Sequence, residues 1–553
     1  MKTSTKRILA TVIIITAISF AVKAQTNVSG GIYGNTTWTK ANSPYIVIDT
    51  VVVFPNITLT IEPGVTVKFD NNIEIEVRQA QLIANGTGTD SITFTSNSLS
   101  PTAGIYPGIY LNGGNLTSSI RYCSFYYAAT GLNDITSDTL TVSNCYFSQN
   151  TIGLQCTSGY VQVDSCNFIA NTSNGLILNG GFNAEMSQCN FLYNGQVALV
   201  AQSGLVMSSC NLLHNGTGIA LNTINLLITN CSFSFNDIGM TFSSIITCIK
   251  DCYSNTYVKN CIFDSDSIAV SQIGWILFDS CMVSHNQTGF SQVGPQCPIR
   301  NCIVDSNLFA GSFYYDSLVN CTVKYNGGGI SMSGGTLVGN DIEYNQGANV
   351  ACAGGIIEGN VIKYGSIGID NTDTSVGTTI TKNVIENNGI GVIIKSSATT
   401  MTCNRICSDS TYDLKYYASS NINVSDNYWC TNDSASIRAK IYDGYVNVSY
   451  GIVTFMPLDT NQCYGPTGIP IYEAQTLSFS IFPNPATDYL TVELPENNSK
   501  SEIKLFNMLG ELVYASRVIK QKTNIDISTF ASGVYIIQIV TGNNISRQKF
   551  IRQ

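Results

Sequence analysis

Charge is the scarcest property of this chain. Of its 553 residues 11% are charged, less than half the share in an ordinary soluble domain, whereas 44% are hydrophobic, and this composition excludes intrinsic disorder. No Lys or Arg occurs between residues 122 and 249, and the formal net charge is −9. A nucleic-acid-binding surface needs clustered cations, which this stretch cannot supply. Nucleic acid is therefore not expected as a partner.

Histidine is almost absent. The chain has 2, His214 and His285, and both fall at the same position of the repeat described below, three coils apart. At one strand spacing per coil they are roughly 14 Å apart, which is too far to share a metal ion. We predict no metal site and no cofactor, and Ca²⁺ would be expected only if the protein were a lyase.

Long apolar runs are missing after the N-terminus. Lys2, Lys6 and Arg7 precede an apolar run over residues 8–22, which is shorter than the ~20 residues that a bilayer requires. The small residues that end at Ala24 predict a signal peptide over residues 1–24, cleaved so that the mature chain starts at Gln25, and no transmembrane segment is expected. The mature protein should enter a compartment where disulfides persist.

The middle of the chain is a repeat of 20–23 residues. A Cys recurs at its zero position, an apolar residue at +2 and Asn at +5, and from residue 340 onward Asn replaces the Cys. The ladder cysteines are Cys123, Cys145, Cys166, Cys189, Cys210, Cys231, Cys261, Cys281, Cys302 and Cys321. Such a period of short strands without helical periodicity favours a parallel β-helix coil. Stacked Asn side chains would satisfy the backbone groups of buried turns.

The resulting fold class is all-β. The opening segment 44–69 and the closing segment Asp426-Asn-Tyr-Trp429 resemble the first and last coils of right-handed parallel β-helix proteins of the pectate-lyase-like superfamily. We therefore expect a right-handed, single-stranded parallel β-helix of about twenty coils with N- and C-terminal caps over residues 25–465. A linker over residues 466–477 follows it.

Cysteine usage separates into two groups. The ladder cysteines are predicted to be buried, reduced thiols, since in-register Cβ atoms are too far apart for good disulfide geometry. Six others lie in a long insertion and near the C-terminal cap, and these are the candidates for disulfides, with open connectivity: Cys248, Cys252, Cys403, Cys407, Cys430 and Cys463.

Residues 478–553 have a different texture, with short alternating strands between turn signals, as in a small Ig-like β-sandwich. They resemble the type A C-terminal sorting domain of the Bacteroidetes type IX secretion system. The motif residues are Pro483, Asn484, Pro485, Gly510, Gly533 and Tyr535. The resemblance implies the type IX translocon and sortase as partners, and a protein that passes the periplasm and is then secreted or attached to the outer surface of the outer membrane.

No complete catalytic set is apparent. A lyase needs a basic group near an acidic cluster, and inverting hydrolysis needs two facing carboxylates. Asn371-Thr-Asp373 is an isolated match to a polygalacturonase element and indicates a turn, and Asp266 takes the place of a ladder Asn close to Asp264. We therefore predict no catalytic residues.

One outward column could bind a ligand. Position +4 holds Tyr325, Tyr344 and Tyr364 on three successive coils, and stacked rings can either contact sugar rings or only stabilise the turn. The leading hypothesis is a monomeric, exported β-helix that binds glycan or another surface polymer without catalysis. The alternatives are a β-helix polysaccharide lyase or glycoside hydrolase, and a structural or adhesive spacer.

Overall fold

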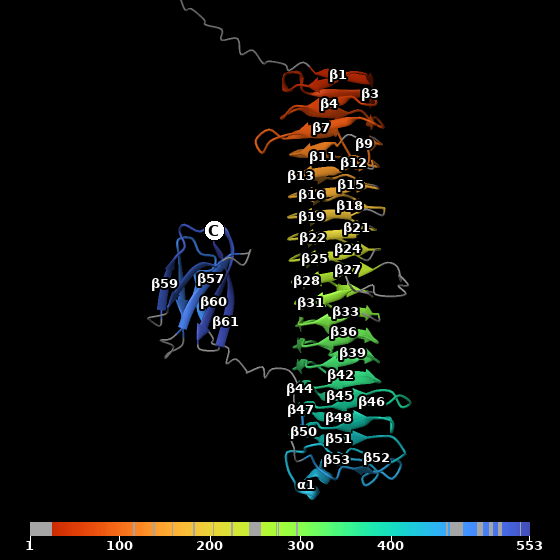
Figure 1. The fold of residues 1–553 in the computed structure, drawn as a ribbon, viewed down its shortest axis with the longest axis vertical. Helices are drawn as coiled ribbons and strands as arrows, with labels where there is room; N and C mark the ends of the chain where they lie inside the picture. Colours follow the sequence, from red (N-terminus) through yellow and green to blue (C-terminus); the bar gives the residue numbers. More distant parts are fainter. Residues whose placement is uncertain are drawn as a thin grey trace, which may run out of the picture. The chain divides into compact units, whose positions relative to one another are not determined.

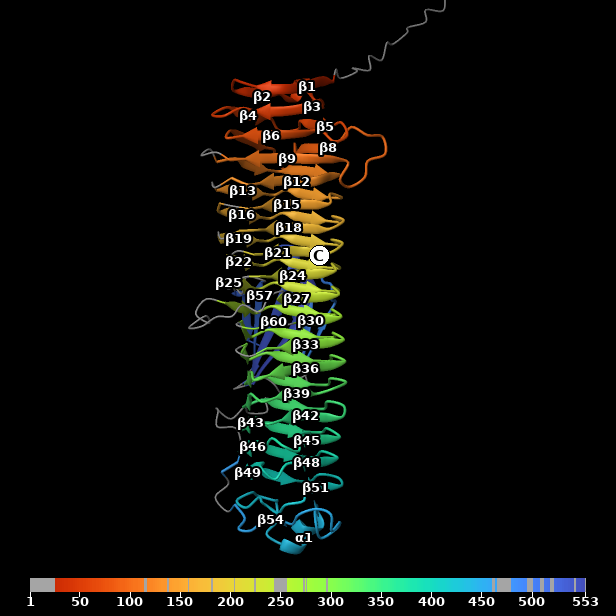
Figure 2. The same cartoon turned by 90° about the vertical axis from the view of Figure 1, so that its right-hand side faces the viewer.

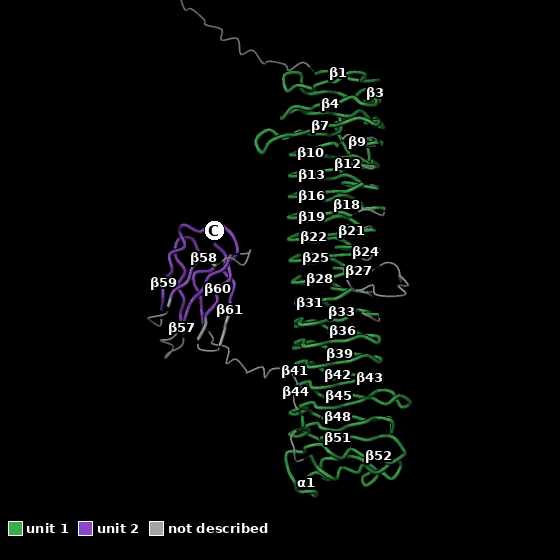
Figure 3. Tube along the Cα trace, viewed as in Figure 1, with its two compact units in different colours: residues 1–467 green, residues 468–553 purple. Residues whose placement is uncertain are grey.

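A computed structural model divides the chain into two compact units, residues 1–467 and residues 468–553 (Figure 3). It describes residues 25–552 except 114–116, 137–138, 158, 181–182, 203, 223–224, 243–255, 272–273, 275, 295–296, 460–462, 465–478, 495–500, 508–511, 518–521 and 542–543. Cys248, Cys252, the linker and Gly510 therefore lie outside the described residues. No helix in the described part of the chain is long and apolar enough to cross a membrane.

The predicted signal-peptide cleavage site falls where the described residues begin. Ala24 lies outside them, whereas Gln25 is described: it is exposed and directly precedes β1 (Thr26–Ile32). The fold of the chain does not test whether the bond between these two residues is cleaved. The signal peptide and the mature start at Gln25 therefore stay predictions.

The first unit winds three parallel sheets around one axis, and each coil gives one short strand to each sheet (Figures 1 and 2). The first sheet begins with β2 (Thr36–Trp38), β4 (Thr58–Ile61) and β7 (Gln81–Asn85) and takes every third strand as far as β49 (Thr400–Thr402). The third sheet begins with β1 and the second half of β3 (Tyr45–Val53), continues through β6 (Glu74–Arg78), and ends with β51 (Tyr412–Tyr416) and β53 (Ile441–Tyr442).

The second sheet positions the candidate site. It runs from the first half of β3 through β5 (Thr66–Phe69) and β8 (Ile92–Ser96) to β50 (Arg405–Cys407). The strands used below are β20 (Asn190–Leu192), β23 (Asn211–Leu213), β26 (Ser232–Ser234), β29 (Ile262–Asp264), β32 (Met282–Ser284), β35 (Ile303–Asp305), β38 (Thr322–Lys324), β41 (Asp341–Glu343), β44 (Val361–Lys363) and β47 (Val384–Glu386).

The solenoid has about 17 turns, fewer than the twenty expected. Several coils are longer than the repeat: Ile83 pairs with Ser119, and Leu227 pairs with Tyr257 across the 243–255 insertion. Because longer coils use more residues, the same length of chain makes fewer turns.

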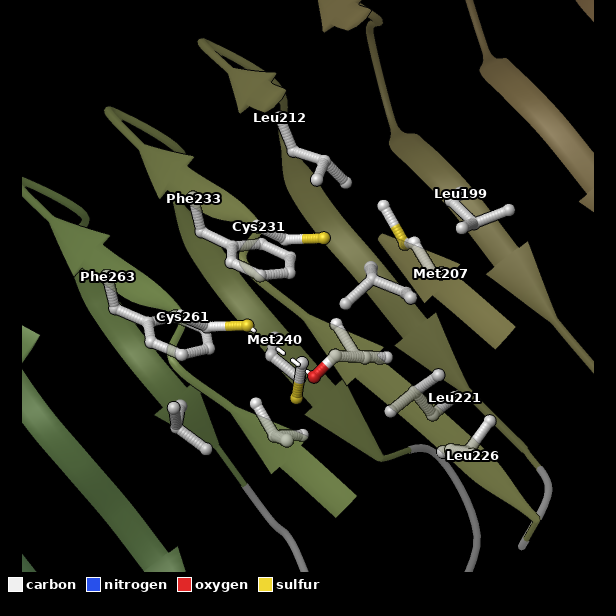
Figure 4. Close-up of a cluster of buried hydrophobic side chains, with 14 of the residues drawn as sticks. Leu199, Met207, Leu212, Leu221, Leu226, Cys231, Phe233, Met240, Cys261 and Phe263 are labelled. Atoms are coloured by element: carbon white, nitrogen blue, oxygen red, sulfur yellow. Dashed lines mark hydrogen bonds between the residues drawn. The ribbon is translucent and has the colours of Figure 1, made fainter. Parts of the chain in front are cut away.

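Part of the core is a row of stacked aromatic rings on successive coils. Phe125, Phe147, Phe168 and Phe191 stack with centroid separations of 4.7, 5.0 and 4.7 Å, which match the spacing of neighbouring strands. Figure 4 shows Phe233 and Phe263 in the same arrangement, 4.6 Å apart, with the thiols of the neighbouring ladder cysteines beside them. The apolar residue at +2 of the repeat therefore forms the interior of the rod.

The Asn at +5 forms the predicted ladder. Asn150 Nδ2 donates to Phe125 O (3.0 Å) of the preceding coil and to Asn171 Oδ1 (3.2 Å) of the following one, and Asn150 N donates to the same oxygen (3.1 Å). Each buried amide thus satisfies both a backbone carbonyl and the next amide in line. The turn before this Asn is fixed by hydrogen bonds on every coil that carries it.

On the coil after that of Asn345, Gly365 stands at the ladder position. Asn349, from β42 (Ala348–Ala353), fills the gap: its Oδ1 accepts from Asn345 Nδ2 (2.9 Å), and its Nδ2 donates to Lys363 O (2.9 Å) and Asn388 Oδ1 (3.3 Å). A Cβ at Gly365 would lie 2.6 Å from Asn349 Nδ2. The ladder therefore continues through the side chain of Asn349, which comes from strand β42 and not from the turn.

The cysteine column is buried and reduced. Cys145 Sγ donates to Ser143 O (3.3 Å), and Cys145 N donates to Cys166 Sγ (3.5 Å). Burial raises the pKa of the Cys145 and Cys166 thiols, which keeps them protonated. At Cys321 the backbone N donates instead to Asn340 Oδ1 (2.8 Å), so Asn takes over the same position.

The last coils are closed by a cap. Disulfides join Cys403 to Cys463 and Cys407 to Cys430, which pairs four of the six cysteines named above. Helix α1 (Ser434–Ala439) begins after Asp433, whose side chain accepts from the amides of Ala435 and Ser436. The only other helical turn among the described residues is η1 (Lys40–Asn42), at the opposite end of the unit.

The second unit is a small antiparallel β-sandwich. One sheet contains β55 (Ser480–Phe482), β56 (Tyr489–Glu493) and β59 (Lys522–Asp526), and the other contains β57 (Ser501–Asn507), β58 (Leu512–Arg517), β60 (Gly533–Thr541) and β61 (Asn544–Arg552). Their inner faces share one core, which includes Leu490, Ile503 and Ile537.

Candidate functional site

The tyrosine row lies in a turn with left-handed backbone. Tyr325, Tyr344 and Tyr364 have φ of 56°, 56° and 57°, immediately after β38, β41 and β44. The same conformation recurs at this position on other coils, where it is occupied by residues such as Gln149 and Ser306. We call this position the outer turn column. Between residues 193 and 364 its members are Tyr193, His214, Phe235, Ser265, His285, Ser306, Tyr325, Tyr344 and Tyr364.

The three tyrosine rings are exposed and stack on one another. Tyr325 is 59% exposed, and Tyr344 and Tyr364 are each 43% exposed. Their centroids are 5.2 and 4.4 Å apart, with interplanar angles of 14° and 13°. Because each ring faces its neighbour, Tyr344 has no free face. The row therefore presents ring edges and phenol oxygens, and outer ring faces only at Tyr325 and Tyr364.

The residues of the Asn ladder that follow the tyrosines fix the turn in which this row lies. Asn326 Nδ2 donates to Val304 O (3.1 Å) and Asn345 Oδ1 (2.8 Å), and Asn345 Nδ2 donates to Val323 O (3.0 Å). Each tyrosine immediately precedes the ladder position of its coil. The hydrogen bonds of the Asn ladder therefore fix the backbone position of each tyrosine.

Charges beside the row are paired. Lys324 contacts Asp341 (2.6 Å) and Glu343 (3.1 Å), and Glu386 contacts Lys363 (2.9 Å). Burial alone would lower the pKa of Lys324, but the two carboxylates outweigh it and hold that pKa above its usual value. The surface around the tyrosines is polar and close to charge balance.

The two histidines occupy the same column as the tyrosines. His214 stacks between Tyr193 and Phe235, and His285 Nδ1 lies 2.7 Å from Asp264 Oδ1. No group of three or more His, Cys, Asp or Glu side chains that could hold a metal ion occurs among the described residues. Asp266 is in the Asn ladder, where Asn236 N donates to its Oδ1 (2.7 Å).

A cavity that the sequence analysis did not identify lies on the first sheet, with a volume of about 500 Å³. Its lining includes Tyr257, Arg300, Tyr315 and Asp316. Asp316 accepts from the amides of Cys297 (2.9 Å) and Ser317 (2.7 Å), and burial raises the pKa of its carboxyl to about 7. The full lining comes from five successive coils with little in common in sequence, so only outward positions on neighbouring strands could have revealed it.

The sorting motif brings together the two ends of the second unit. Asn484 Oδ1 accepts from Ile551 N (2.9 Å) and its Nδ2 donates to Lys549 O (3.2 Å), so the turn with Pro483 and Pro485 holds the final strand. Gly533 begins β60, and Tyr535 Oη donates to Ala531 O (2.8 Å). The motif residues that are described thus fix the edges of this sandwich.

Two family models match the chain. Residues 107–267 match the right-handed β-helix region, and residues 480–553 match the secretion system C-terminal sorting domain. The protein is a right-handed parallel β-helix protein. It carries a type IX secretion C-terminal sorting domain, which indicates secretion by that system to the cell surface or beyond.

One individual relative matches a shorter part of the chain than the β-helix family model does. Ulvan lyase NLR42 of Nonlabens ulvanivorans is 34% identical over 79 residues, which are 14% of this chain and 15% of the lyase. The chain thus matches only about 15% of that relative's length.

Among solved structures, the periplasmic alginate epimerase AlgG is 9% identical, with a TM-score of 0.25 over 65% of this chain and 80% of its own. The A-module of mannuronan C-5 epimerase AlgE6 from Azotobacter vinelandii is 10% identical, with a TM-score of 0.24 over 64% and 90%. The Dettilon tailspike protein is 11% identical, with a TM-score of 0.26 over 95% and 71%. Scores this low say nothing about a substrate.

Proposed function

We propose that the mature protein is an exported glycan-binding rod that holds its ligand on the outer turn column without catalysis. The exposed row Tyr325, Tyr344 and Tyr364 carries this proposal. The turn does not require aromatic residues, because Gln149 and Ser306 adopt the same φ on other coils. Phenol oxygens in a row can hydrogen-bond to sugar hydroxyls, and the two outer ring faces can pack on the apolar face of a sugar.

Binding can be tested on the full mature chain with a panel of neutral and anionic polysaccharides, measured by affinity electrophoresis with and without Ca²⁺. Tyr344→Gln removes the middle ring but keeps a residue that the turn accepts at Gln149. We expect at least tenfold weaker retention by the best-bound polymer. Tyr314→Ala, an exposed tyrosine outside the column, should bind normally. Equal binding by wild type and Tyr344→Gln would refute the proposed site.

A second candidate function is supported by the cavity near Arg300. No ion pair of Arg300 is found in the described part of the chain. Its guanidinium lines the same cavity as two tyrosines and a carboxyl with a pKa of about 7, and such a set of groups suits proton abstraction next to a sugar carboxylate. The partial match to an ulvan lyase is compatible with such an activity. Mass spectrometry of the same mixtures distinguishes the two functions: time-dependent oligosaccharides with unsaturated ends would support a lyase, and intact polymers would support a binding protein.

A further inference from the structure

A second exposed stack occupies the outer turn column on earlier coils. Tyr193 and His214 lie 4.8 Å apart with an interplanar angle of 3°, and His214 and Phe235 lie 4.9 Å apart with an angle of 14°. Tyr193 is 58% exposed, Phe235 is 53% exposed, and His214 is also exposed. This stack repeats the arrangement of the tyrosine row, with His in the middle.

We infer that these two stacks are the two ends of one binding track, which holds a single extended neutral polysaccharide along the axis of the rod. The inference rests on the proposed function, because it takes the tyrosine row to be a glycan-binding surface. It adds a second contact region and names the class of ligand.

The register of the second sheet keeps the two stacks in line. The residue before each column member pairs without a shift from coil to coil, through Leu192, Leu213, Ser234, Asp264, Ser284, Asp305, Lys324 and Glu343. His214 and Tyr344 are therefore six coils apart, which is roughly 29 Å at one strand spacing per coil. Only a polymer of several sugar units can touch both.

The stretch between the stacks is polar. Its column members are Ser265, His285 and Ser306, and the flanking Asp264 accepts from His285, from Ser284 Oγ (2.8 Å) and from Ser265 Oγ (3.2 Å). Hydroxyl and carboxylate groups of this kind hydrogen-bond to sugar hydroxyls. The middle of the track can therefore hold the chain that links the two contact regions.

The charge of the track selects against an anionic polymer. The first stack lies in the stretch without Lys or Arg, and Asp264 and Asp305 flank the middle. At the second stack the flanking Lys324 and Lys363 are already paired with carboxylates. Among the column members and the residues that directly precede them, no Lys or Arg is left unpaired to attract a carboxylate or sulfate, so a neutral chain fits best.

Two weak contact regions on one rigid rod make affinity depend on ligand length. Once one end of a polymer is bound, the other end is held at high effective concentration near the second region. Long chains should bind much more tightly than fragments that reach only one stack.

The test uses the full mature chain and neutral probes, namely a soluble β-glucan, xylan and mannan, each with a series of oligosaccharides from two to twelve units, and alginate as the anionic comparator. Affinities are measured by isothermal titration. We expect the best polymer to bind at least a hundredfold more tightly than its two-unit fragment. His214→Gln and Tyr344→Gln should each reduce that length enhancement at least tenfold, and Tyr314→Ala, outside the column, should leave it unchanged. Thermal unfolding confirms that each variant folds.

Each outcome has a distinct meaning. If Tyr344→Gln weakens binding of the polymer and His214→Gln does not, the second contact region is wrong and the proposed function stands. If neither variant changes binding, the proposed function fails as well. Tighter binding of alginate than of every neutral polymer would overturn the assignment of a neutral ligand.

Discussion

Single residues in the ladder show what a buried turn requires. Asn286 Nδ2 donates to Phe263 O (3.1 Å), and Asn236 Nδ2 donates to Leu212 O (3.0 Å), so each amide supplies one donor to the preceding coil. Asp266 occupies the same column, and its Oδ2 is buried without a partner among the described residues. A protonated carboxyl has a donor where the amide has its NH₂ group. Asp266 can therefore imitate Asn only in its neutral form.

This chemistry predicts how stability changes with pH. Burial raises the pKa of Asp266 from 3.8 to about 7, against the opposing hydrogen bonds from Asn236. The folded state holds the proton more tightly than the unfolded chain, so the stabilisation is complete below about pH 4 and is lost as pH rises through 7. Asp266→Asn should remove this loss and raise the free energy of unfolding at pH 8 by up to about 4 kcal/mol.

Urea unfolding at pH 4.5 and pH 8 measures this effect. Asp264→Asn serves as the control, because hydrogen bonds from His285 and Ser284 outweigh its partial burial and lower the pKa of Asp264. That variant should lose stability at pH 8 rather than gain it. If Asp266→Asn and wild type have the same free energy of unfolding at pH 8, ionised Asp266 does not destabilise the folded state.

At the scale of elements, the strands and turns of the repeat could be predicted from the sequence because each repeat position has one structural role. The residue at +2 lies in the core, the residue at +4 has a left-handed φ, and the residue at +5 lies in the Asn ladder. Spacing alone therefore predicts strands, turns and exposure. The cavity near Arg300 was not predictable in this way, since its lining comes from neighbouring strands without a shared motif. The stacking of the Tyr rings was one of the two possibilities that the sequence left open, because sequence places rings on a column without giving their orientation.

The borrowed amide of Asn349 is a feature of one coil that sequence spacing does not reveal. Asn349→Ala should destabilise the unit by about 3 kcal/mol, because Asn345, Lys363 O and Asn388 lose hydrogen-bond partners in a buried site. Gly365→Asn alone should also destabilise, because its Cβ would clash with Asn349. The double variant restores an Asn at the regular ladder position.

A double-mutant cycle in urea tests this exchange. We expect the double variant to be at least 1 kcal/mol more stable than the sum of the two single changes allows, an effect within the range of directly contacting residues. Additive losses would mean that Asn349 and Gly365 do not occupy one shared site.

At the scale of the whole molecule, a solenoid is held by contacts between neighbouring coils, so its ends are its weak points. The last coils have a neighbour on one side only, and two disulfides, the buried Trp429 and the ion pair of Arg438 with Asp443 (2.7 Å) close them. An exported protein can keep such disulfides, whereas the buried ladder thiols need no oxidation.

The cap should therefore control local rather than global unfolding. The Cys403–Cys463 bond closes a loop with a sequence separation of 60, for which loop entropy gives roughly 4 kcal/mol. In Cys403→Ser/Cys463→Ser we expect hydrogen exchange to accelerate at least a hundredfold from β50 to the end of the first unit. The coils of the Phe125–Phe191 stack should exchange as in wild type, because each coil depends mainly on its neighbours. Equal acceleration in both regions would show that the rod unfolds as one cooperative unit and that its stability is not transmitted coil by coil.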